Sequence, residues 1–333
     1  MDTTAAAWVV AIAAIALAAA TMSPAPADAR SPIRVGVGDQ SPAMFSSPQW
    51  RALNLKRTRY FAPADVMQDV PERLRARAYV IAARVAGIST LLHLSTADLR
   101  SKQGRLVSTS EYARNVGRIV AYFRNLGVRD FGAWNEVNHK TQETWNSPGH
   151  PVSYFQSMYR AVKLGAGPPA ACRSCSVVGL DLLDQAGVDR YIASVYARLS
   201  ATWRKRLTIV GIHNYSDVNR SRSTGTSLII RSVRRYNSRT TFWFTETGAL
   251  ASFGGSFPYS LSRQASRINN MFTYASRYRQ SGVARVYSYN WFGVETHAGC
   301  GAGCRFDAGL VKPDGSPRPA YDTFRTRLQN YSR

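Results

Sequence analysis

The sequence contains little histidine, a single long hydrophobic run and no glycine repeat, and each shortage excludes a class of protein. One apolar run, over residues 5–20, is too little for a multi-span membrane protein. The five histidines show neither a His-x-His nor a His-Glu-x-x-His spacing, so we predict no metal site. No Gly-x-Ser-x-Gly sequence supports a serine hydrolase. Seven Trp, seventeen Tyr and thirteen Phe provide apolar surface that disordered chains lack, so a folded globular protein is expected.

Acidic residues and lysine are also scarce. The chain has 20 Asp and Glu against 43 Lys and Arg, only six of them Lys, and its formal net charge is +23. No run of five basic residues and no nucleic-acid-binding motif accompanies the charge, so no specific nucleic acid partner is expected. Two explanations stay open. A basic surface attracts polyanions such as an acidic glycan or an anionic cell wall, whereas an arginine-biased proteome would produce that surface without a partner.

The N-terminal apolar run predicts a secretory signal peptide. It is rich in Ala and is followed by Pro24, Pro26 and the small-residue sequence Ala27-Asp28-Ala29. We expect cleavage after Ala29, which divides the chain into a signal peptide, residues 1–29, and a secreted or cell-wall-associated domain, residues 30–333. The alternative is an uncleaved anchor, favoured by the absence of Lys or Arg before the run. Its sixteen residues are, however, shorter than the roughly 20 that span a bilayer, so no stable membrane insertion is expected after cleavage.

Eight short segments rich in Val, Ile, Phe and Tyr alternate with helical patterns. The predicted strands are Ile33–Gly38, Lys56–Phe61, Ile88–Leu94, Asp130–Trp134, Ser176–Leu180, Thr208–His213, Thr241–Thr245 and Arg285–Asn290. Between them, Pro71 and the sequence Ser108-Thr-Ser-Glu111 are typical of helix starts. A further apolar stripe at helical spacing covers Val188–Trp203.

This alternation predicts an α/β protein with a (β/α)₈ barrel (TIM barrel). A doubly wound open sheet would need a glycine-rich phosphate loop after its first strand, and Gly36-x-Gly38 lacks the third glycine of that loop. We therefore expect no nucleotide cofactor, nor any other. No linker and no internal repeat divides residues 30–333, which indicates one domain.

Four cysteines in an exported chain indicate two disulfides. They occur as Cys172-x-x-Cys175 and Cys300-x-x-x-Cys304, a pairing that also resembles a four-thiolate zinc site. In a barrel, however, the first pair precedes strand five on the bottom face and the second follows strand eight on the top face. Two local disulfides are therefore the better hypothesis.

Two glutamates stand where a barrel carries its chemistry, at the carboxyl ends of strands. Strand four ends in Asn135-Glu136, and strand seven ends in Glu246. Both follow aromatic-rich segments, and such apolar surroundings would raise the pKa of a carboxyl group and let it act as an acid near neutral pH. Strands four and seven face each other across the barrel mouth. Glycoside hydrolysis requires such a pair, one carboxyl to protonate the leaving oxygen and one to attack the anomeric carbon or activate water.

These motifs resemble those of the clan A glycoside hydrolases, with families 5 and 39 the most similar in style. The resemblance implies that Glu136 is the acid/base, that Asn135 donates to the sugar 2-hydroxyl, and that Glu246 is the nucleophile of a retaining double displacement. It also implies that Tyr215, in His213-Asn-Tyr215, donates to the nucleophile, and that Arg59 keeps it ionised. One departure is that the usual Asn-Glu-Pro is here Asn135-Glu136-Val137.

The resemblance further places Trp291 under the sugar as a stacking surface, and His213 and His93 beside the substrate. Five other acids lie on the loop face and could each bind a sugar hydroxyl; they are Asp39, Glu143, Asp181, Asp217 and Glu295. Tyr287 and Tyr289 are interpreted as barrel-wall packing.

The predicted function is thus a secreted retaining β-glycosidase acting on a carbohydrate substrate, an oligo- or polysaccharide, without metal or cofactor. Two alternatives stay open. One is a non-catalytic glycan- or polyanion-binding barrel at the cell surface, which would use the arginine-rich exterior. The other is a transglycosylase, which would share every residue named and differ in its acceptor.

Overall fold

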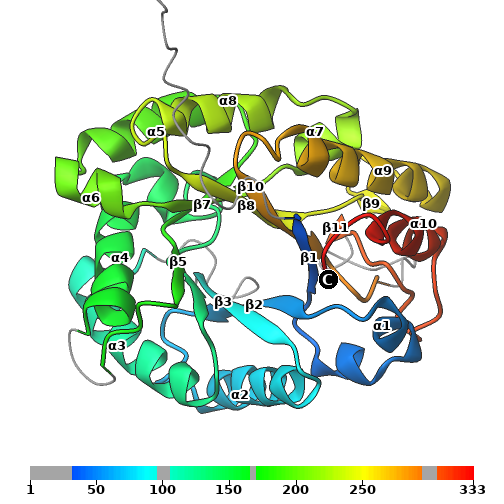
Figure 1. Cartoon of the computed structure of the whole chain (residues 1–333), viewed down its shortest axis with the longest axis horizontal. Helices are drawn as coiled ribbons and strands as arrows, with labels where there is room; N and C mark the ends of the chain where they lie inside the picture. Colours follow the sequence, from blue (N-terminus) through cyan, green and yellow to red (C-terminus); the bar gives the residue numbers. More distant parts are fainter. Residues whose placement is uncertain (1–31, 96–105, 166–169, 295–305) are drawn as a thin grey trace, which may run out of the picture.

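The computed structural model describes residues 32–95, 106–165, 170–294 and 306–333. The predicted signal peptide and the pair Cys300 and Cys304 lie outside these ranges, as does Glu295. Within them the chain forms a ring of parallel strands surrounded by helices (Figure 1).

The ring has the strand order β5-β4-β3-β2-β1-β10-β8-β7-β6, with every neighbouring pair parallel. Its strands are β1 (Arg34–Gly38), β2 (Arg57–Pro63), β3 (Ser89–Ser95), β4 (Asp130–Gly132), β5 (Ser176–Val178), β6 (Leu180–Leu183), β7 (Ile209–His213), β8 (Thr241–Thr247) and β10 (Val283–Tyr289). Only Gly179 separates β5, which pairs with β4, from β6, which pairs with β7. Together they form the fifth strand, so the eight predicted strands are confirmed and the barrel closes.

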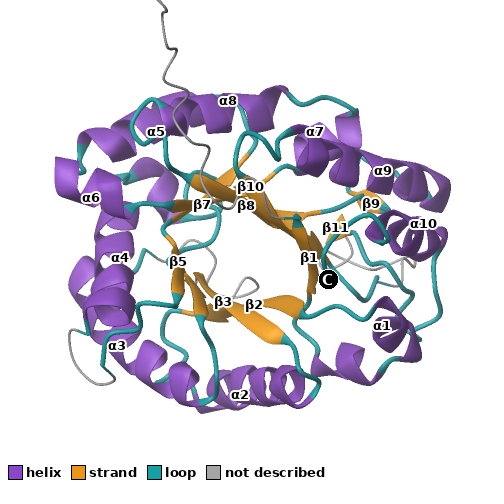
Figure 2. Ribbon diagram, viewed as in Figure 1, coloured by secondary structure: helices purple, strands orange, loops and turns teal. Residues whose placement is uncertain are grey.

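Helices cover the outside of the ring (Figure 2). They are α1 (Pro48–Leu53), α2 (Val70–Val85), α3 (Thr109–Asn125), α4 (Gly149–Tyr159), α5 (Val188–Ala197), α6 (Ala201–Arg206), α7 (Tyr215–Arg220), α8 (Thr224–Arg234), α9 (Leu261–Arg277) and α10 (Pro319–Leu328). Short 3₁₀ turns occur at Pro42–Ser46 and Glu143–Asn146, and a π-helical turn, Arg160–Leu164, extends α4. A small two-stranded antiparallel sheet, β9 (Ser252–Phe253) with β11 (Phe306–Asp307), lies beside the ring.

Side-chain caps set several helix starts. The Ser108 hydroxyl accepts the Glu111 amide at 3.2 Å and so begins α3, as the sequence predicts. Asp69 caps α2 in the same way, with Pro71 in its first turn. The apolar stripe of Val188–Trp203 forms two helices rather than one, because Ser200 leaves the helical conformation and its side chain caps α6.

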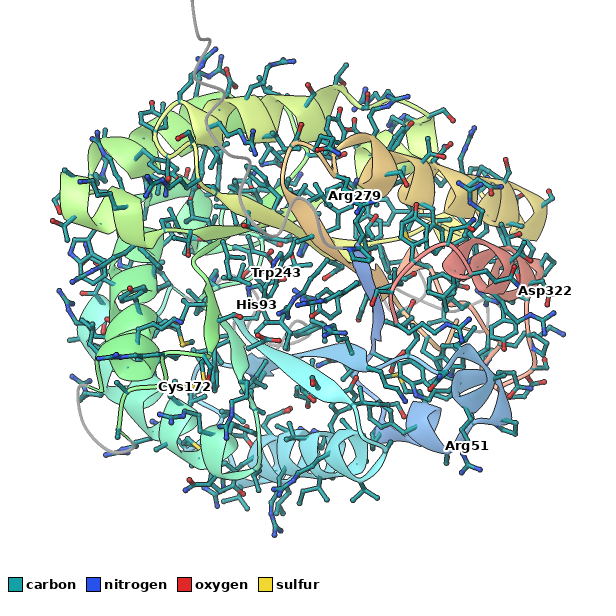
Figure 3. All side chains as sticks on the ribbon, in the orientation of Figure 1. Arg51, His93, Cys172, Trp243, Arg279 and Asp322 are labelled. Atoms are coloured by element: carbon teal, nitrogen blue, oxygen red, sulfur yellow. A yellow bond between two sulfur atoms is a disulfide. The ribbon has the colours of Figure 1, made fainter. Side chains whose placement is uncertain are left out.

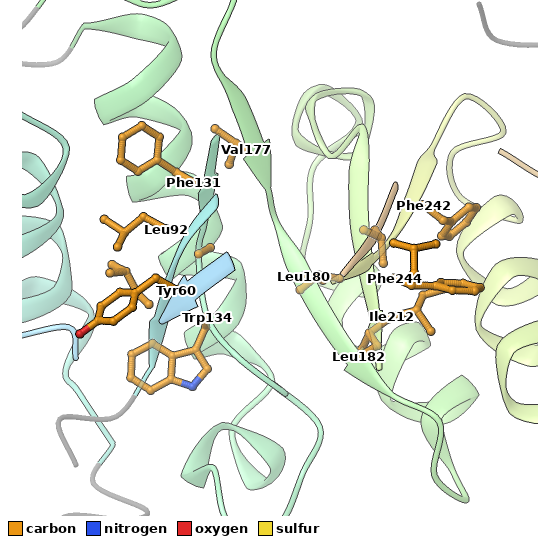
Figure 4. Close-up of a cluster of buried hydrophobic side chains, with 14 of the residues drawn as sticks. Tyr60, Leu92, Phe131, Trp134, Val177, Leu180, Leu182, Ile212, Phe242 and Phe244 are labelled. Atoms are coloured by element: carbon orange, nitrogen blue, oxygen red, sulfur yellow. The ribbon is translucent and has the colours of Figure 1, made fainter. Parts of the chain in front are cut away.

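Alternation along the strands divides the buried side chains into two sets. Residues such as Leu92, Phe242 and Phe244 point outward and pack under the helices (Figure 4). Their neighbours Leu91 and Trp243 point inward and fill the barrel interior with Val178 and Tyr287. Figure 3 places His93 and Trp243 inside the ring, whereas Arg51 and Asp322 lie on the outer face. The interior is therefore packed, and chemistry is confined to the strand ends.

One predicted disulfide is confirmed. Cys172 and Cys175 are bonded, with their Cα atoms 5.3 Å apart, in the loop that leads into β5. In the portion of the chain that the structure describes, no helix is both long and apolar enough to cross a membrane.

Candidate active site

The strand-four glutamate sits in a turn held by backbone hydrogen bonds. The Asn135 amide donates to the Leu94 carbonyl on β3 at 2.8 Å, and the Val137 amide donates to the Asp181 carbonyl on β6 at 3.0 Å. Between them the backbone of Glu136 has a φ of 45°, in the left-handed region that residues other than glycine seldom adopt. Neighbouring strands thus hold Glu136 in a conformation that an isolated loop would not keep.

Glu246, on β8, which is the seventh strand of the barrel, is buried and accepts hydrogen bonds from two donors. One oxygen of Glu246 accepts from Nη1 of Arg59 on β2 at 2.7 Å. Its other oxygen accepts from the Tyr215 hydroxyl at 3.0 Å. Burial raises the pKa of Tyr215, so the phenol keeps its proton and donates it. The contacts that the sequence predicts for Arg59 and Tyr215 are both present.

His213, at the end of β7, connects the two glutamates to a buried acid. Its Nδ1 lies 2.9 Å from Oε1 of Glu136, and its Nε2 lies 2.7 Å from Oδ2 of Asp181. The contact of Nδ1 with Glu136 is a hydrogen bond, whereas Nε2 lies close to Asp181 without hydrogen-bond geometry and forms an ion pair. Two carboxylates this close to the ring favour its positively charged form. The geometry therefore favours an imidazolium.

The same imidazole limits the distance between the two glutamates. His213 Nδ1 lies 2.9 Å from Oε1 of Glu136 and 3.8 Å from Oε2 of Glu246, so these oxygens are at most 6.7 Å apart, the sum of the two distances. Retaining glycosidases place their carboxyl groups about 5–5.5 Å apart and inverting enzymes roughly 6.5–9.5 Å apart. The two carboxylates thus meet over the barrel mouth, at a separation that is compatible with the retaining arrangement.

The charges of the site set its protonation. Burial alone would lower the pKa of His213, but the carboxylates of Asp181 and Glu246 outweigh it and raise that pKa to about 10. Burial alone would raise the pKa of Asp181, but the cations His213 and Arg59 lower it well below its usual range. The buried centre of the site is therefore an ion network, in which an acid and an imidazolium stabilise each other.

The pKa of Glu136 differs from the sequence-based expectation. Burial does act to raise it, as the aromatic surroundings predict, but the hydrogen bond and charge of His213 outweigh burial and lower the pKa. The expectation was wrong because it considered only the apolar neighbours and not the cation on β7. In the free protein, the proton resides on the imidazole side of the Glu136–His213 hydrogen bond.

Asn135 is oriented by the arginine that holds Glu246. Nη2 of Arg59 donates to Oδ1 of Asn135 at 2.6 Å. Arginine has no acceptor, so this bond identifies the amide oxygen and turns the NH₂ group away from Arg59. Asn135 can therefore offer a donor to a ligand beside Glu136.

Two residues predicted to contact substrate do not reach the site surface. His93 has no exposed surface, and its Nε2 lies 3.2 Å from the Trp134 carbonyl and 3.5 Å from Asp181. Burial lowers the pKa of His93 to about 3, so its imidazole is neutral and packs against Asp181 beneath the site. The substrate contact predicted for His93 is corrected to this structural role. His213 is equally buried and contacts carboxylates rather than solvent.

The stacking role predicted for Trp291 is also wrong. Its amide donates to Oδ2 of Asp39 at 2.9 Å, and its ring, with no exposed surface, packs on Trp50 and Tyr321 with centroids 5.4 and 6.0 Å away. The chain has already turned outward at this point. The ring at the mouth belongs to Tyr289, whose carbonyl lies 3.5 Å from the Tyr215 hydroxyl.

Of the other loop-face acids that the structure describes, Asp181 is the one that joins the site. The sequence listed it only among several candidates, because a lone Asp at a strand end carries no distinctive pattern. Asp39 and Asp217 are buried caps of backbone amides, and Glu143 is exposed. His139, which the sequence did not single out, lies 3.7 Å from Glu136. Among the residues with assigned positions, no group of three or more His, Cys, Asp or Glu is arranged to hold a metal.

Neither a protein-family model nor a curated protein matches this sequence. Solved structures do match it. The chain is similar to a GH5_18 protein from Streptomyces cattleya in complex with GlcNAc, with 16% identity and a TM-score of 0.61 over 90% of this chain and 80% of that one. It is similar to native xylanase 10B from Thermotoga maritima, with 14% identity and a TM-score of 0.58 over 89% and 95% of the two chains.

A third similar structure is the exo-beta-1,4-mannosidase Op5Man5 from Opitutaceae bacterium strain TAV5. Identity is 12% and the TM-score is 0.62, over 89% of this chain and 59% of that one. At such identities the likeness concerns the fold. The predicted (β/α)₈ barrel is confirmed.

Proposed function

We propose that this protein is a secreted glycoside hydrolase that cleaves the β-linkages of an oligo- or polysaccharide with retention of configuration. The observation that carries the proposal is the meeting of Glu136 and Glu246 on either side of His213, at most 6.7 Å apart by the two distances from Nδ1. The proteins of similar fold include, by name, a xylanase and a mannosidase, which supports a carbohydrate substrate. Secretion rests on the predicted signal peptide alone.

In the first step, a carboxylate oxygen of Glu246 attacks the anomeric carbon. The bond from that carbon to the leaving oxygen breaks, and its electron pair goes to the oxygen, which takes a proton from Glu136. Arg59 and Tyr215 aim Glu246 at the sugar. The product of this step is a covalent glycosyl-enzyme and a released alcohol.

The proton comes from the Glu136–His213 pair. In the free protein it lies on the imidazole, 2.9 Å from Glu136. A bound sugar removes water from the partly exposed Glu136 carboxylate, which raises the pKa of that group and draws the proton across the hydrogen bond. In the second step, Glu136 takes a proton from water, the hydroxide oxygen bonds the anomeric carbon, and Glu246 leaves. The proton then returns to His213, so one pair serves as acid and base.

Asn135 supplies the contact with the sugar ring. Its amide oxygen is occupied by Arg59, so its NH₂ group donates to the hydroxyl next to the anomeric carbon. Such a bond strengthens as positive charge develops on the ring, and it therefore favours the transition state.

Single substitutions test the pair. Glu246→Ala is expected to abolish turnover, and Glu136→Ala to lose it on substrates with poor leaving groups but retain it on aryl glycosides whose leaving group needs no proton. Asp322→Ala, an exposed carboxylate on α10, is the control. Polysaccharide panels with NMR of the first-formed anomer measure activity and stereochemistry. Full activity in both glutamate variants, or inversion, would refute the proposal.

A transglycosylase would use the same residues with a sugar hydroxyl in place of water. Product analysis with added acceptor sugars separates the two. Longer products at the expense of hydrolysis would assign the transferase reaction. A barrel that only binds glycans would retain carbohydrate without releasing reducing ends.

A further inference from the structure

A series of aromatic rings leads away from the proposed active site. The ring of Phe306, on β11, lies 5.3 Å from that of Tyr215, which binds Glu246, and 6.2 Å from that of Tyr289 at the barrel mouth. The ring of Phe253, on β9, lies 5.9 Å from Phe306 and is 46% exposed. The aromatic side chains of the β9–β11 sheet thus extend from the carboxylate pair to solvent.

Arginines continue the series. The Phe253 amide donates to the Phe257 carbonyl at 2.8 Å. Two guanidinium groups lie over the Phe257 ring, that of Arg220 at 5.0 Å and that of Arg263 at 5.7 Å from the ring centroid. Tyr259, in the same loop, is 49% exposed. An exposed Phe and an exposed Tyr beside stacked arginines form a surface that is apolar and cationic together, which an isolated surface residue would not be.

The next arginines lie on α9 and reach the loop between α7 and α8. Arg267 donates to the Ser221 hydroxyl, and Arg277 donates to the Ser223 hydroxyl at 2.9 Å. Figure 1 shows α7, α9 and β9 gathered on one side of the barrel. Hydroxyl oxygens are neutral acceptors, so they orient these guanidinium groups without cancelling their charge.

Exposed carboxylates are missing from the described residues of this face. Residues 190–294 contain sixteen Lys and Arg but only two acids, Asp217 and Glu246, both buried. Oδ2 of Asp217 accepts the Thr226 amide at 2.6 Å, and Glu246 is bound by Arg59. In the described part of the chain, 23 exposed residues are basic and three, Glu143, Asp314 and Asp322, are acidic. A proteome bias explains arginine in place of lysine, but it does not explain the lack of exposed carboxylates.

We propose that these residues form an aromatic–arginine track, Phe306, Phe253, Phe257, Arg220, Arg267 and Arg277, that binds an acidic polysaccharide leaving the active site. The inference rests on the proposed function and names its substrate class. Aromatic faces pack on the C–H groups of sugar rings, and guanidinium groups pair with carboxylate, sulfate or phosphate groups on the polymer. A neutral glycan would use the rings and leave the arginines unpaired.

The track begins beside the catalytic carboxylates, which favours a glycan over a nucleic acid. Single-stranded nucleic acids also combine stacking on aromatic rings with arginine contacts, so they are the principal competitor. Their binding would need no connection to Glu246, whereas a polysaccharide substrate must pass that residue. The experiment therefore includes both.

The test measures binding in Glu246→Gln, which separates affinity from turnover. Carboxymethyl cellulose, cellulose sulfate and cellulose phosphate represent the three anion types on one β-linked backbone; hydroxyethyl cellulose is the neutral polymer, and oligo(dT) the nucleic acid. The track variant is Phe253→Ala with Arg220→Gln and Arg267→Gln. Its matched control, Leu74→Ala with Arg84→Gln and Arg118→Gln, changes one exposed apolar residue and two exposed arginines on α2 and α3, away from α7 and α9 in Figure 1. Thermal unfolding verifies that both variants fold.

We expect the track variant to bind at least one acidic polysaccharide ~10-fold more weakly or worse, because it loses two charge-assisted contacts and one stacking ring. The control should stay within about twofold of the parent, and Phe253→Trp should retain binding because it keeps an aromatic face. The anion that binds most tightly identifies the polymer type. Equal losses in the track and control variants would mean a diffuse charge effect and would overturn the inference, as would tighter binding to oligo(dT) than to every acidic polysaccharide.

Failure of the proposed function looks different. If the wild-type protein bound an acidic polysaccharide through the track but released no reducing ends from any polymer, the hydrolase assignment would fall and the track would stand. If it hydrolysed neutral polymers and the track variant matched the parent on every acidic polymer, the track would fall and the hydrolase would stand.

Discussion

A single imidazole decides the electrostatics of this site. His213 lies against Asp181, Glu136 and Glu246, and two further charged or titratable groups, Arg59 and His93, face Asp181. Counted as ions, three carboxylates are opposed by two cations, so one negative charge remains where an oxocarbenium-like sugar would develop positive charge. Of these three carboxylates, Asp181 is the one that touches no substrate in the proposed mechanism. Its function is to keep His213 protonated.

Asp181→Asn is therefore predicted to lower the pKa of His213 below its value of about 10. The isosteric amide keeps the shape of the side chain but removes the charge that raises this pKa. NMR titration of the imidazole measures this change in pKa and does not depend on enzymatic activity. The alkaline limb of the pH–activity profile should move to lower pH with it, because the essential proton is then lost earlier. Asp184→Asn is the control, since Asp184 is also buried but binds the amides of Ser216 and Asp217 instead.

The same variant has a defined effect on stability. The folded pKa of His213 is raised above its ordinary value of 6.5, so this stabilisation is full below about pH 6.5 and lost as pH rises through about 10. Asp181 has a lowered pKa, so its stabilisation is present above about pH 3.8 and lost as pH falls. The loss of melting temperature in Asp181→Asn should thus be largest between about pH 4 and 6.5. A loss that grew toward pH 10 would contradict this account.

At the residue scale, the sequence predicted the ends of strands better than the direction of side chains. Glu136 and Glu246 could be located because each stands at the carboxyl end of a predicted strand, and the barrel places those ends together. Trp291 lies only two residues beyond Tyr289, but Asp39 binds its amide and turns it outward. Asp181 could not be recognised because its importance depends on contacts from β2, β3 and β7, which no local pattern records.

At the element scale, hydrophobic periodicity identified all eight strands of the barrel but neither their bounds nor the small β9–β11 sheet. Predicted strand Ser176–Leu180 is β5 and β6, joined at Gly179, where an added Cβ would lie 2.3 Å from Leu207. Strands β9 and β11 have two residues each, too few for any period to appear. The small β9–β11 sheet that carries part of the proposed track therefore could not be predicted from the sequence.

Replacing glycine by alanine is predicted to change stability in opposite directions at two positions. A Cβ at Gly132, on β4, would lie 2.4 Å from the ring of His93, whereas one at Gly117, within α3, would meet nothing within 4 Å. Gly132→Ala should destabilise the fold by about 1–3 kcal/mol through overpacking. Gly117→Ala should stabilise it by roughly 0.5–1 kcal/mol, because alanine is the better helix former. Chemical denaturation measures both, and a shift of the same sign in the two variants would contradict the assigned positions.

At the scale of the whole molecule, acids and bases are separated by depth. The carboxylates of Asp181 and Glu246 in the site are buried, as are others such as Asp307, which pairs with Arg318 at 2.8 Å. The exterior, in contrast, is basic. The net charge of +23 is read directly from the sequence. Its division between interior and surface is not, because whether a carboxylate is exposed depends on which strand end or cap it occupies. The exposed arginines therefore face one another with few counter-charges.

This separation predicts that salt stabilises the protein. Repulsion among exposed like charges weakens as the Debye length falls from about 30 Å at 0.01 M to about 10 Å at 0.1 M, whereas the buried ion network is screened little. If screening recovers about 1 kcal/mol, the melting temperature should rise by roughly 2–4 °C between 10 and 100 mM sodium chloride. Sucrose at matched osmolality is the control for solvent effects. A melting temperature that stayed constant or fell with sodium chloride would mean that the exposed arginines do not repel one another enough to matter, and that their charge has no measurable cost in the folded protein.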